Sequence, residues 1–259
     1  RDRLRSRGLG DVYKRQILLY SCFLLSLPMM AQQNNMSVSN AQHEAVSDAK
    51  TQNKALRDSL AAATNELAYH PDSIDLRLKK AAWNIQLEQW AYAKDDLDKV
   101  LFLNNTNIAG LFYRAFVNEK MKRYNFARLD YQNLLVLVPG NFQAQLGLAL
   151  LNEKDKHYTE AYDGINNLIE QYPDSAMAYA ARGGMEKERG MLELAEYDYA
   201  KAVSLDEANQ DYRINRIDLL ISLGRKQEAY RELEALIKKG VAPGQLQDFY
   251  RRLRDKRKK

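Results

Sequence analysis

The chain has 259 residues with one cysteine and three histidines, so it holds no pair of cysteines for an internal disulfide. Its net charge of +5 is concentrated at the ends: residues 1–16 carry +4 and residues 251–259 carry +6, which leaves −5 on residues 17–250. A nucleic-acid-binding protein is expected to carry positive charge over a folded face. This distribution therefore argues against a nucleic-acid partner.

Two segments at the start of the chain are expected to lie outside the fold. Residues 1–16 resemble translated sequencing-adapter read-through, and the alternative is the basic n-region of a signal peptide. Residues 17–31 form an uncharged apolar run, shorter than the roughly 20 residues that span a bilayer. The run is typical of the h-region of a secretory signal peptide cleaved after Ala31, and a buried helix at the start of the fold is the weaker alternative. We therefore expect export to a bacterial periplasm or to the outer membrane.

Cys22 lies inside this apolar run. The residues Leu19, Tyr20, Ser21 and Cys22 loosely resemble a lipoprotein processing site, but the run stays apolar past Cys22, where a lipidated N-terminus would turn polar. Cleavage after Ala31 would leave a chain without cysteine, and so without a thiol nucleophile or a zinc–cysteine site.

Residues 32–42 are predicted to form a polar linker that leads into a helix over residues 43–69. This helix would cover the first complete repeat, or form the second helix of a degenerate one that ends before Pro71. Its apolar positions are Ala55, Leu56, Leu60, Ala63 and Leu67.

Residues 70–242 repeat with a period of 34 residues. If repeats begin at Ile74, Ile108, Phe142, Ala176 and Gln210, then position 20 of every repeat is alanine and position 8 is small in four of the five. Position 20 is Ala93, Ala127, Ala161, Ala195 and Ala229, and position 8 is Ala81, Ala115, Ala149, Gly183 and Ile217. Position 32 is Pro139 and Pro173 in repeats two and three. A fixed period of this length indicates a stack of similar units.

These positions resemble the tetratricopeptide repeat (TPR), a helix–turn–helix unit of 34 residues. The resemblance implies an all-α solenoid of about five repeats, a right-handed superhelix with capping helices at its ends. Small residues at positions 8 and 20 let the two helices of a hairpin approach, and proline at position 32 stops the second helix. Repeat five departs at Ile217 and Lys226, so we expect it to pack less closely.

Residues 243–259 are predicted to form a C-terminal capping helix with a basic tail. The residues Leu246, Phe249, Tyr250 and Leu253 fall on one face of a helix over residues 245–254. This apolar face would cover repeat five, since solenoids need polar caps. The alternative is that the basic residues attract an anionic membrane surface or an acidic partner.

No catalytic motif is present in the sequence: there is no phosphate-binding glycine loop, no Gly-x-Ser-x-Gly elbow and no His-Glu-x-x-His. The residues His43, His70 and His157 have no ligand spacing, and a metal site needs three or four convergent ligands. We therefore expect no enzymatic activity, no metal, no cofactor and no small-molecule substrate.

The TPR resemblance implies that the first helix of each repeat lines a concave face, with positions 2, 5, 9, 12 and 13 pointing into it. The partner-binding residues that this predicts are Leu78, Phe112, Phe116, Glu119, Lys120, Leu146, Leu150, Glu153, Lys154 and Lys187. They would form an apolar stripe flanked by charges, suited to a peptide or helix of a partner protein. Alternatively, the same apolar residues are ordinary core. The clamp for a C-terminal carboxylate found in some family members is not matched, because Leu78 and Ala82 stand at its Lys and Asn positions.

The sequence therefore predicts an exported, non-catalytic protein-interaction scaffold. One rival is an accessory factor of outer-membrane protein assembly, similar to the five-repeat lipoprotein of that pathway, which lipidation of Cys22 would favour. The other is a binder of anionic surfaces through the basic tail, with peripheral membrane association.

Overall fold

The computed structural model describes residues 39–254, with side chains described from residue 54. The expectations for residues 1–38, including cleavage after Ala31 and lipidation of Cys22, lie outside the described residues, as does the tail at 255–259. Contacts divide the chain into two compact units, residues 1–47 and 48–259. The second unit holds all five repeats, and residues 39–254 contain helices and no strand. This confirms the all-α class.

The repeats have the boundaries that the 34-residue period predicts. The first helices of the five hairpins are α3 (Ile74–Gln86), α5 (Ile108–Lys120), α7 (Phe142–Lys154), α9 (Ala176–Glu188) and α11 (Gln210–Ser222). The second helices are α4 (Trp90–Leu103), α6 (Tyr124–Leu137), α8 (Tyr158–Gln171), α10 (Leu192–Leu205) and α12 (Lys226–Lys238). Each helix begins 34 residues after its counterpart in the preceding repeat.

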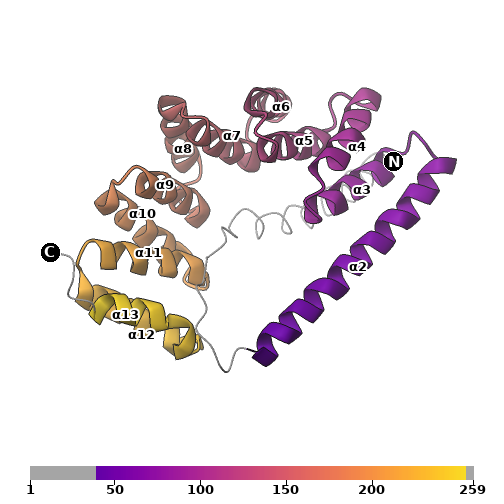
Figure 1. The fold of residues 1–259 in the computed structure, drawn as a ribbon. Coiled ribbons are helices and arrows are strands. Elements are labelled where there is room, and N and C mark those ends of the chain that lie inside the picture. Colours follow the sequence, from indigo (N-terminus) through magenta and orange to yellow (C-terminus); the bar gives the residue numbers. More distant parts are fainter. Residues whose placement is uncertain (1–38, 255–259) are drawn as a thin grey trace, which may run out of the picture. The chain divides into compact units, whose positions relative to one another are not determined.

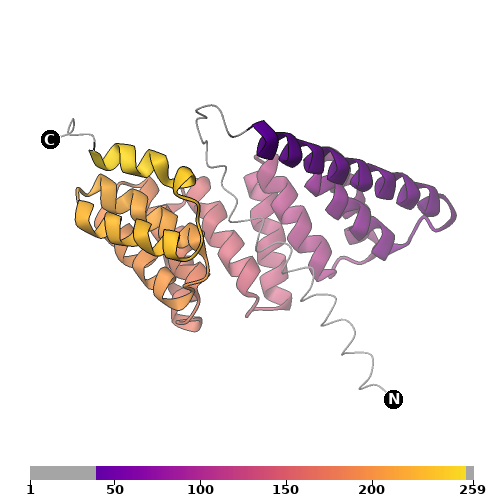
Figure 2. The ribbon, with the colours of Figure 1, turned by 90° about the horizontal axis from the view of Figure 1, so that it is seen from below.

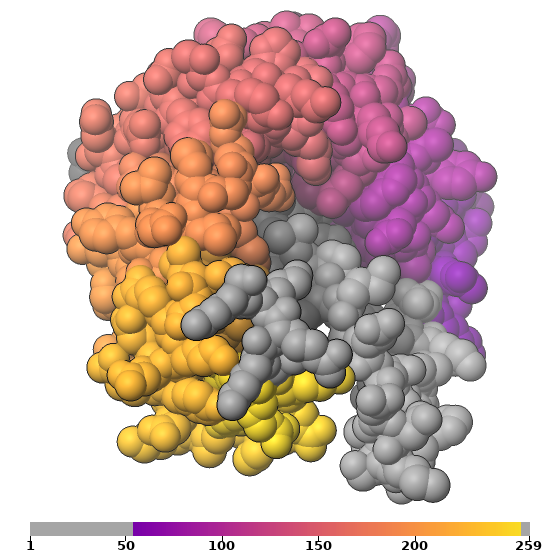
Figure 3. Space-filling view, turned by 60° about the vertical axis from the view of Figure 1, so that its left-hand side comes forward, coloured from indigo at the N-terminus to yellow at the C-terminus, as the bar shows by residue number. Residues whose placement is uncertain are grey.

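The hairpins of the second compact unit follow one another in chain order along an arc (Figures 1 and 3). The first helices of repeats one to four lie on the inner side of this arc, where α3 contacts α5, α5 contacts α7 and α7 contacts α9. The second helices lie on the outer side (Figure 1). The predicted concave face is therefore the row formed by α3, α5, α7 and α9.

Local sequence sets the start of every first helix. A serine or asparagine precedes each of them, and its side-chain oxygen accepts a hydrogen bond from a backbone N–H of the first turn. These N-caps are Ser73, Asn107, Asn141, Ser175 and Asn209. They also recur every 34 residues, so the signal is present in the sequence.

The turn inside each hairpin contains one residue with a left-handed backbone. Its φ angles lie between +57° and +76°, in the region that favours glycine. These residues are Glu88, Lys122, Lys156, Gly190 and Gly224. Only repeats four and five therefore place glycine at this position.

The small positions are buried, as close helix packing requires. The alanines at positions 8 and 20 have exposed fractions of 0–1%. At Gly183, an added Cβ would come within 3.1 Å of the Tyr199 ring and within 3.2 Å of the Ala195 carbonyl oxygen. Pro139 and Pro173 each follow the end of a second helix by two residues, which agrees with their predicted role as stops.

Repeat five is closed by the C-terminal segment. A 3-10 turn (Pro243–Leu246) leads into α13 (Gln247–Arg254), which Figure 2 shows in yellow beside the last hairpin. Leu246, Phe249 and Leu253 are buried in one cluster with Ile217 and Leu233 of repeat five. The α11–α12 contact is the least extensive of the five hairpins, which agrees with the looser packing predicted from the bulky side chain of Ile217.

At the other end of the repeats, α2 (Ser39–Tyr69) begins four residues earlier than the sequence predicts. No proline or glycine interrupts residues 39–42, so nothing there stops the helix. Ala63 and Leu67 are its buried residues among the described side chains, whereas Ala55 is exposed and Leu56 and Leu60 are half-buried. Within residues 39–254, no helix has the length and apolar character needed to cross a membrane.

Candidate functional site

All ten residues predicted to bind a partner lie on the inner row of helices. Leu78 is on α3, and Lys187 is on α9. The other eight lie on α5 and α7, namely Phe112, Phe116, Glu119, Lys120, Leu146, Leu150, Glu153 and Lys154. Because α3, α5, α7 and α9 pack in sequence, these residues lie along one continuous row.

The apolar members of this row divide into two groups. Phe116 and Leu146 are each only 2% exposed, and Leu146 belongs to the core cluster between α7, α8 and α9. Leu78, Phe112 and Leu150 are half-buried. The row therefore combines core residues with a discontinuous set of partly accessible ones.

The charged members mostly form contacts between successive repeats. Lys154 lies 2.7 Å from Glu119 of the preceding repeat, and Lys187 lies 2.6 Å from Asp218 of the next. The Lys120 ammonium lies over the Phe116 ring at 5.1 Å from its centroid. Glu153 is 8% exposed and forms no ion pair within residues 54–254.

A second set of ion pairs, not predicted from the sequence, joins the two helices inside most hairpins. Position 7 carries a cation that binds a carboxylate at position 23. The pairs are Lys80–Asp96, Arg114–Asp130, Arg182–Asp198 and Arg216–Glu232. Repeat three has Leu148 and Gly164 at these two positions. The 34-residue spacing of both residue types is the signal that could have revealed the pairs.

The buried aspartates of these pairs change the pKa values of the arginines that bind them. Burial would lower the pKa of Arg114, but hydrogen bonds to Asp130 and Asp98 raise it above its usual value. The bond to Asp198 raises the pKa of Arg182. Burial raises the pKa of Asp96 in spite of Lys80. The two guanidinium groups therefore remain charged and serve as structural ties.

Repeats two and three meet where α6 packs against α7, which we call the joint between them. Arg128, at position 21, holds this joint. Its guanidinium donates to Asn152 at 3.0 Å and to Asp155 at 2.5 Å, at positions 11 and 14 of the next repeat. The Glu119–Lys154 pair adds a second tie between positions 12 and 13. Two cations therefore stabilise this joint.

The joint between repeats three and four has different residues at the same positions. Tyr162 replaces the arginine, and Glu188 replaces the lysine. The other polar residues at this joint are Glu153 of repeat three and Glu186 and Arg189 of repeat four. The α8–α9 contact is the least extensive of the contacts between the second helix of one repeat and the first helix of the next.

Carboxyl groups at this joint are hard to ionise. Burial, then the charge of Asp198, raise the pKa of Glu186 to about 7. Burial also raises the pKa of Glu153, and the nearby Glu188 adds to the shift. Burial together with the charges of Glu186 and Glu153 raises the pKa of Tyr162 to about 12. Tyr162 is therefore close to two carboxyl groups that form no ion pair within residues 54–254.

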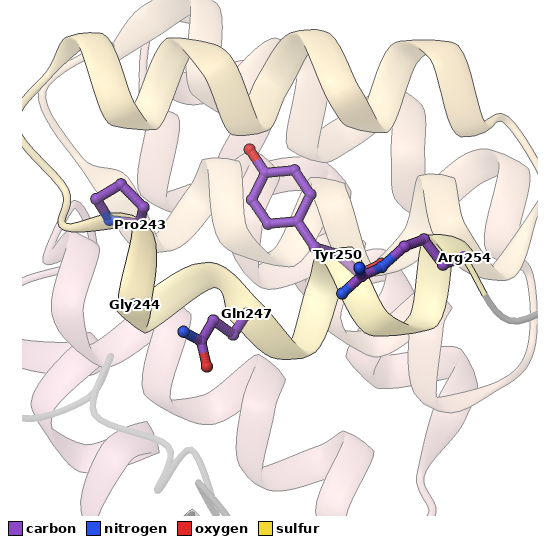
Figure 4. Close-up of a pocket in the computed structure, with 5 residues that line it drawn as sticks. All are labelled: Pro243, Gly244, Gln247, Tyr250 and Arg254. Carbon is purple, nitrogen blue, oxygen red and sulfur yellow. The ribbon is translucent and has the colours of Figure 1, made fainter. Parts of the chain in front are cut away.

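The structure also has two hollows, at the C-terminal cap and at the start of α3. One is lined by Pro243, Gly244, Gln247, Tyr250 and Arg254 at the C-terminal cap (Figure 4). The other surrounds the turn between α2 and α3, near His70 and Pro71. Neither hollow assembles a nucleophile with a base. Within the described part of the chain, no three histidine, cysteine, aspartate or glutamate side chains meet as metal ligands.

Large apolar side chains are also exposed on the outer helices, which the sequence did not indicate. Those more than half exposed on α4, α6 and α10 are Tyr92, Phe102, Phe126, Leu129, Val136, Leu194 and Tyr197. Lys99 and Arg123 lie over the Phe102 and Phe126 rings. These side chains belong to the second helices and so lie outside the inner row.

Comparison with known proteins identifies the architecture. No protein-family model and no curated protein matches the chain. A tetratricopeptide repeat protein from Parabacteroides merdae ATCC 43184 is 18% identical, with a TM-score of 0.65 over 96% of this chain and 97% of that one. The fold is that of a TPR solenoid. A thermophilic TPR protein of Thermus thermophilus, TTC0263, has the same fold at 18% identity, with a TM-score of 0.55 over 70% of this chain and 99% of that one.

MamA is a third structure with this TPR fold. It is 19% identical, with a TM-score of 0.53 over 62% of this chain and 94% of that one. At such identities the similarity establishes the TPR solenoid itself, so any function of this chain has to be argued from its own residues.

Proposed function

We propose that this TPR solenoid is a non-catalytic scaffold that binds a peptide or helix of a partner protein on the inner row formed by α3, α5, α7 and α9. The observation that carries the proposal is that Leu78 and Leu150 are half-buried on this row, which also carries the ion pair of Glu119 with Lys154. Partly exposed apolar groups beside fixed charges suit a polypeptide ligand with an apolar face and a polar edge.

The proposal of a scaffold rather than an enzyme rests on what the inner row presents. Several of its charged groups form ion pairs between repeats, such as Lys187 with Asp218. Its apolar groups are aliphatic and aromatic side chains at helical spacing. Neither set provides a nucleophile activated by a base, as acyl or phosphoryl transfer would require.

A comparison of surface variants tests the inner row. The purified chain is immobilised and exposed to an extract of the source cells, beside a Leu78→Asp/Leu150→Asp variant. A matched control, Tyr92→Asp/Phe126→Asp, alters the outer helices instead. We expect the inner-row variant to lose a protein that the parent and the control retain, with circular dichroism confirming that all three fold. Equal capture by parent and inner-row variant would contradict the proposal.

We also propose that the protein acts outside the cytoplasm, in the periplasm or at the outer membrane. The support is the apolar run at residues 17–31, with the features of a signal peptide. Mass spectrometry of the mature N-terminus tests this. A chain that starts at Gln32 supports export, whereas a lipidated Cys22 supports the rival role in outer-membrane protein assembly. An N-terminus upstream of residue 17 would contradict both.

The second rival, an anionic-surface binder, is favoured by the basic residues at 251–259. Two of them have partners in the fold, because Arg252 lies 2.7 Å from Asp218 and Arg251 pairs with Asp248. A chain ending at Arg254 keeps the buried Leu253 and removes the rest of the tail. If this shortened chain still sediments with phosphatidylserine vesicles as the parent does, the tail is not the membrane-binding element.

A further inference from the structure

The joint between repeats three and four contains polar atoms that are buried and unpartnered. Glu153 and Glu186 are 8% and 6% exposed, and within residues 54–254 the Oε2 atom of each accepts no hydrogen bond. When Glu186 is protonated, it shares a hydrogen bond with the Asp198 carboxylate, which contributes to its raised pKa. The hydroxyl oxygen of Tyr162 is also buried without a partner. Buried polar groups are normally hydrogen-bonded, so three such atoms at one joint call for a physical explanation.

At the joint between repeats two and three, cations bind the polar groups at the equivalent positions. There Arg128 projects from α6 and binds positions 11 and 14 of the next repeat through its guanidinium. Lys154 satisfies the glutamate at position 12, Glu119. At the next joint, position 21 is Tyr162 and position 13 is Glu188, so these two positions carry no cation there.

Two arginines lie near the unpartnered carboxyl groups, and neither pairs with them. The Arg182 guanidinium donates to both carboxylate oxygens of Asp198, at 2.6 and 2.8 Å. The Arg189 guanidinium lies over the rings of Tyr158 and Tyr162, at 4.2 and 5.7 Å from their centroids, and forms no ion pair within residues 54–254. Its charge acts to lower the pKa of Glu153, but burial outweighs it and the pKa stays raised. This joint therefore has more hydrogen-bond acceptors than donors, and more carboxyl groups than cations that pair with them.

We propose that this group, which we call the Tyr162 recess (Glu153, Tyr162 and Glu186), receives a lysine or arginine side chain of the partner polypeptide. The inference rests on the proposed function, because Glu153 and Lys154 lie on the inner row that the partner would follow. An ammonium or guanidinium group donates several hydrogen bonds to carboxylates and restores the missing charge. The charge of −5 on residues 17–250 is complementary to such a basic partner.

Small amides test the recess without knowledge of the partner. The full chain, with its glutamate side chains labelled with carbon-13, is titrated with N-acetyl-arginine amide and N-acetyl-lysine amide. The neutral isostere N-acetyl-citrulline amide is the control probe. We expect saturable shifts of the Glu153 and Glu186 carboxyl signals with the two cationic amides only. We also expect the pKa of Glu186 to fall from about 7 towards its ordinary value when the arginine amide is bound.

Matched variants separate the recess from general charge attraction. Glu153→Gln/Glu186→Gln keeps the shape of both side chains and is expected to weaken binding of the arginine amide at least tenfold. Glu160→Gln/Glu170→Gln removes two exposed carboxylates of α8 and is expected to leave binding unchanged. Circular dichroism and the melting temperature show that both variants fold.

Three results would overturn the inference. If citrulline amide shifts the same signals as arginine amide, the recess holds water and neutral donors. If the two variants weaken binding equally, the attraction is a diffuse charge effect. If the parent binds neither cation, the inference fails, and a further rise of the pKa of Glu153 in Arg189→Gln would identify Arg189 as its internal partner.

Two further results separate this inference from the proposed function. If the amides bind but the inner-row variant captures the same proteins as the parent, the recess stands and the proposed function fails. If the inner-row variant loses a partner that the Glu153→Gln/Glu186→Gln variant captures as well as the parent does, the proposed function stands and the recess fails.

Discussion

The joint between repeats two and three and the joint between repeats three and four are formed by equivalent helices but carry different residues at equivalent positions. The first is held by two cations, Arg128 and Lys154. The second, which we call the weaker joint, has Tyr162 and Glu188 in their places, and the carboxyl groups of Glu153 and Glu186 there have raised pKa values. In a solenoid each repeat touches only its neighbours, so one joint can change without disturbing the rest.

This difference shows that successive repeats of one chain can differ in the residues at which they meet. The positions that build the hairpin, such as Ala161 and Ala195, are the same on both sides of the weaker joint. The positions between hairpins differ, and there the chain leaves buried acceptors unpaired. Such groups cost stability, so they are the places where a partner's donor has most to contribute.

The largest expected effect comes from giving position 21 of repeat two the tyrosine that repeat three has at this position. Arg128→Tyr removes the hydrogen bonds to Asn152 and Asp155 and leaves both groups without their cation. We expect the free energy of unfolding to fall by about 2–3 kcal/mol, as for hydrogen bonds to partly buried charged groups. Urea denaturation followed by circular dichroism measures it. A loss below about 0.5 kcal/mol would mean that the tie contributes only as a surface ion pair does.

A change of pH is expected to act mainly on the weaker joint. Burial and Asp198 raise the pKa of Glu186 to about 7, so the folded chain holds this proton more tightly than the unfolded chain. The stabilisation is fully present below the unfolded pKa of roughly 4.3 and is lost as pH rises through 7.

The expected loss from Glu186 is about 1–2 kcal/mol of unfolding free energy between pH 5 and pH 8.5. Arg182, Asp198 and Tyr162 are the other charged or titratable groups that face it. Melting temperatures of the parent and of Glu186→Gln across this range measure the effect. If both proteins show the same pH dependence, Glu186 is not its source.

Substitutions at the left-handed turn residue inside the hairpins are expected to change the free energy of unfolding by a smaller amount. This residue is not glycine in the first three repeats and is glycine in the last two. Lys122 adopts φ of +59° and Gly190 adopts +76° at the same position. Lys122→Gly is expected to raise the free energy of unfolding by about 1 kcal/mol, and Gly190→Ala to lower it by about the same amount. Thermal unfolding of the two variants checks both signs. Two changes of the same sign would show that backbone strain does not control these turns.

The smallest expected effect is a partial repair of the weaker joint. Glu188→Lys places an ammonium group where Lys154 stands in the preceding joint, close to Glu153. We expect a gain of about 0.5 kcal/mol, because position 188 is exposed and surface pairs are weak. The pKa of Glu153 should fall at the same time, which carbon-13 titration measures. A pKa that stays raised would show that burial alone controls Glu153.

Much of the fold could be predicted because its signals are local and recur. The five helix starts follow from the 34-residue period, and the N-caps Asn107, Asn141 and Asn209 carry the same period. The left-handed turn could be predicted only at Gly190 and Gly224, because Glu88, Lys122 and Lys156 have no preference for that conformation.

The sequence by itself determined the repeat length, the start of each repeat and the first helices on which the residues of the inner row lie. Each of these depends on the spacing of small and apolar residues along one chain. Only the tertiary structure decided that Phe116 and Leu146 are buried while Leu78 and Leu150 remain partly exposed. It alone brought Glu153, Tyr162 and Glu186 together, since burial and charge at a joint depend on three helices, α7, α8 and α9, packing against one another.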